Sequence, residues 1–115
     1  MRIVLALALV LMAQPALAAT GEQLFGDNCA SCHTTGAAST PDAPTLKGVV
    51  GRKIASLQDF QYSAGLKAKT GTWDDAALDA FLAAPQSFAP GTQMYGAASD
   101  PNDRKAIIAY LKTVK

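Results

Sequence analysis

The residues after position 18 contain too few large apolar side chains to form a globular core on their own. Val, Ile, Leu and Phe together make up 17 of those 97 residues, about 18%, which is below the level expected of a self-sufficient globular domain. A small domain with so thin a core needs disulfides, a metal or a cofactor to hold it together. Because two cysteines allow at most one internal disulfide, a metal or a cofactor is the first expectation.

The first 18 residues have the pattern of a secretory signal peptide. Arg2 precedes the apolar run Ile3–Met12, and Ala16-Leu17-Ala18 supplies the small-residue cleavage pattern. The run of about ten residues is too short to cross a bilayer as a helix. We expect cleavage after Ala18 or Ala19, export to the periplasm, no stable membrane anchor afterwards, and one mature domain over residues 19–115. An uncleaved anchor or a buried helix is the alternative.

The mature chain carries no net formal charge. Loss of Arg2 leaves nine Lys and Arg against nine Asp and Glu. This balance argues against a nucleic-acid binder and against binding to a membrane surface through basic charge. It also argues against disorder, which usually combines few apolar residues with a high net charge.

The first half of the mature chain predicts two helices separated by a long irregular segment. Thr20 and Gln23 form a capping box for a helix from Gly21 to Cys32. Residues 34–48 are rich in Thr, Ser, Ala, Gly and Pro and predict a loop. A second, short helix is expected over Ser63–Lys69.

The second half predicts two stronger helices. Thr72 caps a helix that runs to Ala84 and is stopped by Pro85, and residues 85–99 form a loop. Asp100 and Pro101 open the last helix. Its apolar stripe has helical spacing and consists of Ile107, Tyr110, Leu111 and Val114. Because no strand pattern is present, we expect an all-α fold of four to five short helices with long loops.

The segment with the most specific chemistry is Cys29-Ala30-Ser31-Cys32-His33, the C-x-x-C-H signature of haem attachment. Each thiol can add to one vinyl group and form a thioether, and two intervening residues place both sulfurs within reach of neighbouring porphyrin edges. The adjacent imidazole then supplies a nitrogen ligand to the iron. We therefore expect one covalent haem c on Cys29 and Cys32, with His33 bound to the iron.

Other functions of a C-x-x-C pair fit the sequence less well. A thioredoxin-like oxidoreductase needs βαβ patterning, which is absent, and a structural zinc site needs a further thiolate or histidine, which the chain lacks. A simple surface disulfide is the remaining alternative, but it would leave the thin core unexplained.

Met94 is the candidate for a second axial ligand. Iron that moves electrons without binding substrate normally needs one, His33 is the only histidine, and Met1 and Met12 leave with the leader. Met94 follows Pro90-Gly91-Thr92-Gln93, a turn that can lay a thioether over the haem. The alternative is that Met94 fills a gap in the core, as methionine usually does.

These motifs and several others, in this order, resemble the class I c-type cytochromes, the soluble haem electron carriers of mitochondria and the bacterial periplasm. The match runs from Gly21 to Lys112. Besides Cys29–His33 it rests on Gly21-x-x-x-Phe25, Pro44-x-Leu46, Gly51-Arg52-Lys53, Tyr62-Ser63, Trp73, Pro85, Pro90-Gly91-Thr92-x-Met94 and Ile108-Ala109-Tyr110-Leu111-Lys112. The resemblance implies the cytochrome c fold, wrapped around one haem.

The resemblance also implies roles for single residues. His33 and Met94 would be the axial ligands, and the carbonyl of Pro44 would accept the other ring N–H of His33. Gly21 and Phe25 would pack against Ile107 and Tyr110, where the first and last helices cross. Buried carboxylates need donors or a cation, so the haem propionates would be surrounded by Arg52, Tyr62, Ser63, Trp73 and Thr92. Ordinary packing is the alternative for Tyr62 and Trp73.

Two departures from the mitochondrial members bear on function. Phe81 stands where those members have a tyrosine, so it cannot hydrogen-bond the Met94 sulfur. Where they place lysines around the exposed haem edge, this chain has Gln86, Ser87 and Gln93, and the segment Tyr95-Gly96-Ala97-Ala98 is small and mostly uncharged. We therefore expect an apolar docking patch and little electrostatic steering.

The expected function is that of a monomeric periplasmic carrier of single electrons rather than an enzyme. Its partners would be a redox donor and acceptor, such as a dehydrogenase, an oxidase or a membrane cytochrome complex. A haem c subunit of a dehydrogenase or oxidase complex is the alternative. A peroxidase with five-coordinate iron would lack a sixth ligand, and Met94 argues against it.

Overall fold

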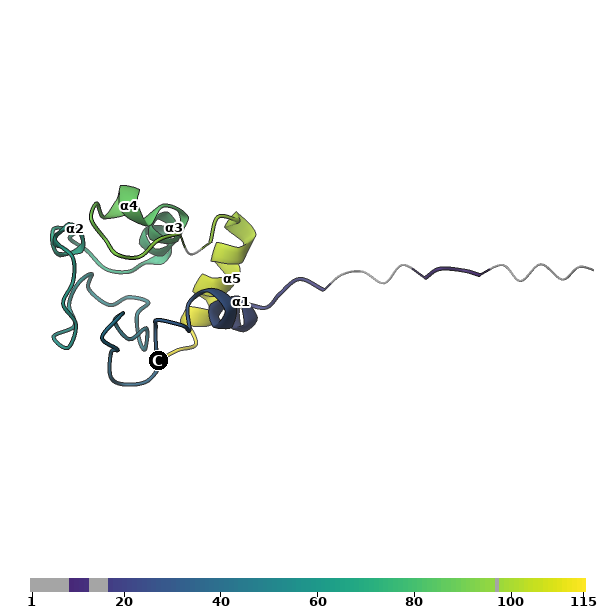
Figure 1. The fold of residues 1–115 in the computed structure, drawn as a ribbon, viewed down its shortest axis with the longest axis horizontal. Helices are drawn as coiled ribbons and strands as arrows, with labels where there is room; N and C mark the ends of the chain where they lie inside the picture. The colour runs from purple at the N-terminus through teal and green to yellow at the C-terminus, as the bar shows by residue number, and fades with distance from the viewer. Residues whose placement is uncertain (1–8, 13–16, 97) are drawn as a thin grey trace, which may run out of the picture.

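The computed structural model describes residues 9–12, 17–96 and 98–115. Its helices are α1 (Gly21–Asn28), α2 (Ala64–Lys67), α3 (Asp75–Ala83), α4 (Pro85–Phe88) and α5 (Pro101–Leu111). Over these residues the only extended pairing is an isolated bridge between Lys53 and Thr72, so the all-α prediction is confirmed. The described residues before Thr20 run away from the helical body (Figure 1).

Helix α1 is shorter than predicted. The capping box is present, because Thr20 Oγ1 accepts from the Gln23 N–H at 3.2 Å and Gln23 Oε1 accepts from the Thr20 N–H at 2.9 Å. The helix ends at Asn28 rather than Cys32, because the backbone leaves helical torsions at Cys29 (φ −122°, ψ −37°). The His33 N–H then donates to the Cys29 carbonyl at 2.9 Å. A separate turn therefore carries both cysteines and the histidine.

The ends of α3 also differ from the prediction. Its N-cap is Asp74, whose Oδ1 accepts from the Ala77 N–H at 2.8 Å, whereas Thr72 lies in the isolated bridge before the helix. Pro85 follows α3 as expected, but it also begins α4 inside the segment predicted to be a loop. Proline suits that position because the first turn of a helix needs no N–H from it.

Helices α2 and α5 agree closely with the prediction. Ser63 caps α2, with its Oγ accepting from the Leu66 N–H at 3.3 Å. Asp100 caps α5 by accepting from the Asn102 N–H at 2.7 Å. Helix α5 buries Ile107, Ile108 and Leu111, Tyr110 is half-buried, and Val114 lies beyond the end of the helix. No helix among the described residues is long and apolar enough to cross a membrane.

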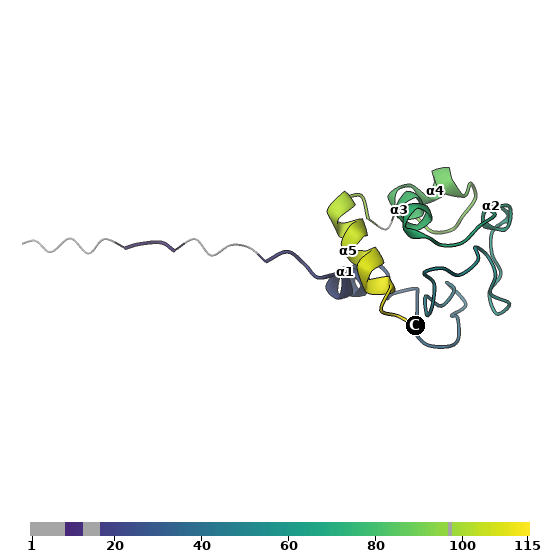
Figure 2. The same cartoon turned by 180° about the vertical axis from the view of Figure 1, so that it is seen from behind.

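Helices α1 and α5 cross at close range, which confirms the packing that the resemblance implies (Figures 1 and 2). The ring centroids of Phe25 and Tyr110 are 5.3 Å apart, and Ile107 is 1% exposed. A Cβ on Gly21 would press against the carbonyl oxygen of Ala106, so only glycine permits this approach. The crossing fixes the end of α1, and with it the turn that carries the cysteines.

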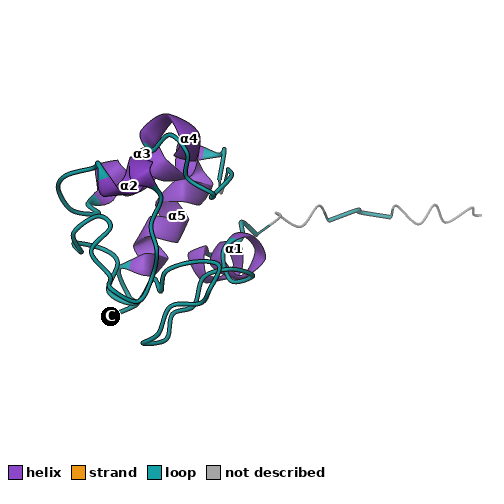
Figure 3. Cartoon of the chain, turned by 60° about the vertical axis from the view of Figure 1, so that its left-hand side comes forward, coloured by secondary structure: helices purple, strands orange, loops and turns teal. Residues whose placement is uncertain are grey.

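The long loop between α1 and α2 folds beside the helices (Figure 3). Backbone hydrogen bonds to Trp73 tie it to them. The Gly51 N–H donates to the Trp73 carbonyl and the Trp73 N–H donates to the Arg52 carbonyl, both at 2.8 Å. The Trp73 ring packs on Phe81 and Phe88, with centroids 5.2 and 5.6 Å away. These contacts place Arg52 beside an aromatic cluster formed with α3 and α4.

Candidate cofactor site

One cavity of about 530 Å³ brings together all of the residues predicted to form the site. They are Cys29, Cys32, His33, Pro44, Arg52, Tyr62, Ser63, Trp73, Thr92 and Met94. The rest of the wall is mainly apolar and, apart from Phe81, was not predicted from the sequence to be part of a site. It includes Leu46, Val49, Leu66, Leu78, Phe81, Leu82, Ile107 and Leu111. A mostly apolar cavity of this volume with a few polar groups is typical of cofactor sites.

His33 enters this cavity with one ring nitrogen already occupied. Its Nδ1 lies 2.8 Å from the carbonyl oxygen of Pro44. A carbonyl can only accept, so Nδ1 carries the proton and Nε2 keeps a free lone pair. Burial lowers the pKa of His33, the Pro44 hydrogen bond opposes that shift, and the charge of Arg52 adds to it. The side chain is therefore a neutral imidazole, which is the form that binds metal ions.

Both cysteines line the same cavity as free thiols. Cys29 is 5% exposed, and burial raises the pKa of its thiol, whereas Cys32 is exposed. A protonated, buried thiol does not suit thiol–disulfide exchange, in which the thiolate attacks. Across the residues that the structure describes, no three His, Cys, Asp or Glu side chains are grouped so that they could hold a metal ion.

Arg52 brings a half-buried cation to the wall of the cavity. Its two terminal nitrogens donate to the carbonyls of Thr45 and Lys47 at 3.0 and 3.2 Å. Its Nε is buried and has no hydrogen-bond partner among the described residues. Burial lowers the pKa of Arg52, and the nearby Tyr62 and Asp59 oppose that shift. Buried donors are normally paired, so the unsatisfied N–H indicates a place for an anionic group such as a carboxylate.

Three hydroxyl groups on this wall each have a hydrogen that is available to donate. Tyr62 accepts from the Leu57 N–H at 3.3 Å, Ser63 caps α2, and Thr92, 4% exposed, accepts from the Met94 N–H at 3.4 Å. In each case the oxygen accepts and the hydroxyl hydrogen is left to donate elsewhere. Burial raises the pKa of Tyr62, which keeps its hydroxyl protonated. Tyr62 also packs edge-on against Phe60, with centroids 5.2 Å apart.

Met94 reaches the cavity from the loop between α4 and α5. The side chain is half-buried, lines the cavity and packs against the apolar core. Two thiols, a neutral imidazole, a thioether, an apolar wall and an unpaired guanidinium N–H fit a covalently attached haem with its two propionates. Among the described residues that line this cavity, Asp42 is the one carboxylate.

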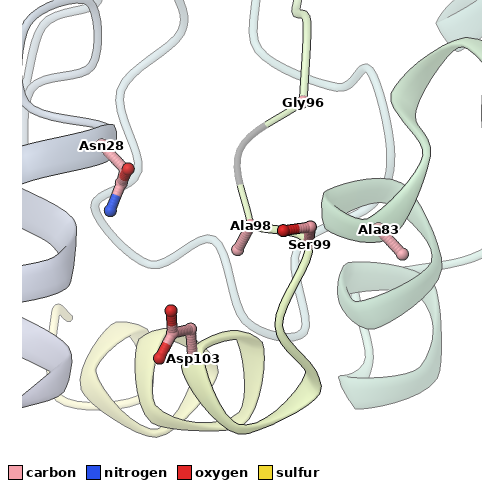
Figure 4. Close-up of a pocket in the computed structure, with 6 residues that line it drawn as sticks. All are labelled: Asn28, Ala83, Gly96, Ala98, Ser99 and Asp103. Atoms are coloured by element: carbon pink, nitrogen blue, oxygen red, sulfur yellow. The ribbon is translucent and has the colours of Figure 1, made fainter. Parts of the chain in front are cut away.

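The segment after Met94 lies at the rim of this cavity and against a second one. Tyr95 is 79% exposed, while Ala97 lies outside the described residues. The second cavity, of about 270 Å³, holds none of the predicted site residues (Figure 4). It is lined by Asn28, Ala83, Gly96, Ala98, Ser99 and Asp103.

Comparison with known proteins places the whole fold in one family. The family model described as cytochrome c matches residues 18–115. Cytochrome c of Tetrahymena pyriformis is 41% identical over 98 residues, covering 84% of this chain and 88% of that protein. Cytochrome c2 iso-1 of Magnetospirillum fulvum is 39% identical over 92 residues, covering 77% and 93%. The solved structure of cytochrome cH from Methylobacterium extorquens superposes with a TM-score of 0.74 at 42% identity, covering 81% and 94%. The chain belongs to the class I c-type cytochromes.

Proposed function

We propose that this protein is a free, periplasmic carrier of single electrons whose covalent haem c is ligated by His33 and Met94. Members of its family carry electrons on a covalently bound haem. The observation that carries the ligand assignment is the composition of one cavity. Both cysteines, the only histidine and the only methionine beyond the leader line the same wall.

The ligand assignment follows from the chemistry of these side chains. Cys29 and Cys32 supply the two thioether bonds, and His33 presents a free Nε2 because Pro44 holds its Nδ1–H. Met94 is the remaining soft ligand. When bound, the haem iron supplies the one-electron couple. Two ligands held by packed segments can stay in place in both oxidation states, which keeps the reorganisation on electron transfer small.

The surroundings favour the reduced form. A thioether ligand raises the reduction potential, and an apolar, water-poor wall disfavours the extra positive charge of the oxidised form. Leu78, Phe81 and Leu82 of α3 supply one part of that wall. Phe81 offers no hydroxyl to the Met94 sulfur, so the thioether donates more strongly to the metal, which favours the oxidised form and partly offsets these two effects.

The polar wall suits the haem propionates. Arg52 contributes the unpaired Nε–H, and the hydroxyls of Tyr62, Ser63 and Thr92 have hydrogens left to donate. Trp73 contributes its indole N–H from the aromatic cluster, because an indole nitrogen can only donate. Together these groups compensate the desolvation of two carboxylates, which would otherwise oppose haem burial.

Export to the periplasm is supported by the form of the first residues. The apolar side chains of Leu9, Val10, Leu11 and Leu17 are between 76% and 95% exposed. Leaving so many large apolar groups in water is unfavourable, so this segment suits an export machinery better than a folded domain. Cleavage after Ala18 or Ala19 would leave the helical body intact, since α1 begins at Gly21.

The ligand assignment is tested by replacing Met94 with alanine and comparing Gln93→Ala as the control. In the oxidised parent we expect the weak far-red absorption band of methionine-ligated iron. Met94→Ala should lose that band, bind carbon monoxide rapidly and lower the reduction potential, whereas Gln93→Ala should change none of these. A band and potential that persist in Met94→Ala would exclude Met94 as the ligand.

The location and the free state are tested in native cells. The haem-stained protein should be released with the periplasmic fraction and should elute from size exclusion at the mass of a single mature chain. Elution with a larger haem- or flavin-containing assembly would instead assign it to a dehydrogenase or oxidase complex. Retention in the cytoplasm would exclude export.

A further inference from the structure

The side chain of Gln86 makes two hydrogen bonds, and both end on the backbone of the loop that carries Met94. Its Nε2 donates to the carbonyl of Thr92, and its Oε1 accepts from the Gly91 N–H at 3.3 Å. Gln86 is the second residue of α4 and makes no capping bond to that helix. Its amide therefore serves the loop rather than the helix on which it stands.

Helix α2 also packs against this stretch of loop. A Cβ on Gly65 would press against the carbonyl oxygen of Pro90 and would lie 2.9 Å from the carbonyl carbon of Ala89. Helix α2 thus lies directly on the backbone that leads into the loop. Gly91, at φ +85°, turns the chain between this contact and Thr92. The loop is fixed over residues 89–92, immediately before the methionine.

Backbone donors within the turn add one more link. The Thr92 N–H donates to the Ala89 carbonyl at 3.0 Å, and Thr92 Oγ1 accepts from the Met94 N–H at 3.4 Å. Thr92 is therefore bonded to Gln86 through its carbonyl and to Met94 through its hydroxyl. Releasing the Gln86 amide would break the two side-chain hydrogen bonds that tie this turn to α4.

We propose that Gln86 is a positioning residue for Met94, whose amide clamps Gly91 and Thr92 and so keeps the thioether in the cavity. The proposal rests on Met94 being the iron ligand, as proposed above. A clamp of this kind sets the fraction of molecules in which the loop has opened and the iron can take another ligand. The apparent affinity for an external ligand rises in proportion to that fraction.

Imidazole binding to the oxidised, haem-loaded protein measures this fraction. Two hydrogen bonds at a partly exposed site are expected to restrain opening by about tenfold, which corresponds to about 1.4 kcal/mol. Gln86→Leu removes both bonds at similar side-chain size, so we expect it to bind imidazole about tenfold more tightly than the parent. Its methionine–iron band should disappear at correspondingly lower imidazole concentration.

Two controls separate positioning from a general loss of stability. Gln93→Leu makes the same substitution one residue before Met94, where the amide has no hydrogen bond among the described residues. Asp74→Ala removes the N-cap of α3 and weakens the fold by about 1 kcal/mol without touching the loop. Both should bind imidazole within about twofold of the parent. Equal tightening in either control would overturn the proposal.

A second variant covers the case in which Gln86→Leu fails to mature. Gln86→Glu keeps an oxygen for the Gly91 N–H but places another against the Thr92 carbonyl, so it should also bind imidazole more tightly. Affinities within about twofold of the parent in the Gln86 variants would show that the clamp does not hold Met94. A parent protein without any methionine–iron band would instead refute Met94 as the iron ligand, and with it the role of Gln86 in positioning Met94.

Discussion

Replacing Gly21 with alanine tests whether the close crossing of α1 and α5 is what fixes the cysteine turn. A Cβ at this position would press on the carbonyl oxygen of Ala106, and would lie 2.8 Å from its carbon and 3.0 Å from the Cβ of Tyr110. Ordinary contact begins at about 3.4 Å, so the helices have to separate by roughly half an ångström or more. The main obstacle is helix backbone, which cannot swing aside as a flexible side chain would.

The size of the effect follows from two opposing contributions. Overpacking of this kind costs about 1–3 kcal/mol, and a rigid backbone obstacle favours the upper end. Alanine regains at most about 1 kcal/mol through its higher helix propensity. The net loss of unfolding free energy is therefore about 2 kcal/mol. For a domain of this size, that corresponds to a fall in Tm of roughly 8–16 °C.

Gly26 provides a matched control on the same helix. A Cβ there would meet no atom within 4 Å, so Gly26→Ala gains helix propensity without a clash. It should raise the unfolding free energy by about 0.5–1 kcal/mol. Thermal and denaturant unfolding of the mature, haem-loaded variants, followed by far-UV circular dichroism, measures both. If Gly21→Ala is as stable as the parent, or if its unfolding free energy rises as that of Gly26→Ala does, the close crossing of α1 and α5 does not determine the stability of the fold.

Three further predictions concern charge. Hydrogen bonds from Ser39 lower the pKa of Asp59, so the ionised carboxylate stabilises the folded state above about pH 4, and this stabilisation is lost on acidification. In Asp59→Asn the unfolding free energy should therefore fall less steeply between about pH 5 and 3, and an unchanged slope would contradict this. The Arg104 side chain is 11% exposed, pairs with Asp79 at 2.7 Å and donates to two loop carbonyls, so Arg104→Met should lower the unfolding free energy, measured by urea titration, by about 1–2 kcal/mol. Lys112→Met removes an exposed ion pair and should lower it by less than about 0.5 kcal/mol, and equal losses in the two variants would refute this ranking. The rate at which membranes of the host oxidise the reduced protein should differ by less than about threefold between low and physiological salt, because the chain without its leader has no net charge. A steep fall in this rate with salt would reveal a local charged docking patch.

The sequence was sufficient for the parts of this protein that depend on local chemistry. Thr20 and Gln23 predicted a capping box and Asp100 and Pro101 the start of a helix, because caps are set by residues only two or three positions away. The motif Cys29–His33 and the single Met94 predicted which side chains would share a wall. The order of motifs resembling the cytochromes c predicted the polar part of the wall, namely Pro44, Arg52, Tyr62, Ser63, Trp73 and Thr92, which spacing alone could not bring together, but not most of its apolar part.

Other features depend on packing and could not be read from local pattern. Helix α1 stops at Asn28 because Cys29–His33 forms its own turn toward Pro44, although the residues themselves would allow a longer helix. Pro85 predicted the end of one helix but also starts another, and both positions suit proline because neither needs its backbone N–H. The contacts of Gln86 with Thr92 and of Gly65 with Pro90 join segments that nothing in their sequence relates.

The intact mass of the purified mature protein, measured together with its pyridine haemochrome spectrum, tests most directly whether the chain carries a covalent haem. We expect a mass equal to residues 19–115 or 20–115 plus one haem, and the spectrum of a haem joined through two thioether bonds. A colourless protein with the mass of the bare polypeptide, or a haem that acidic organic solvent extracts, would contradict the account.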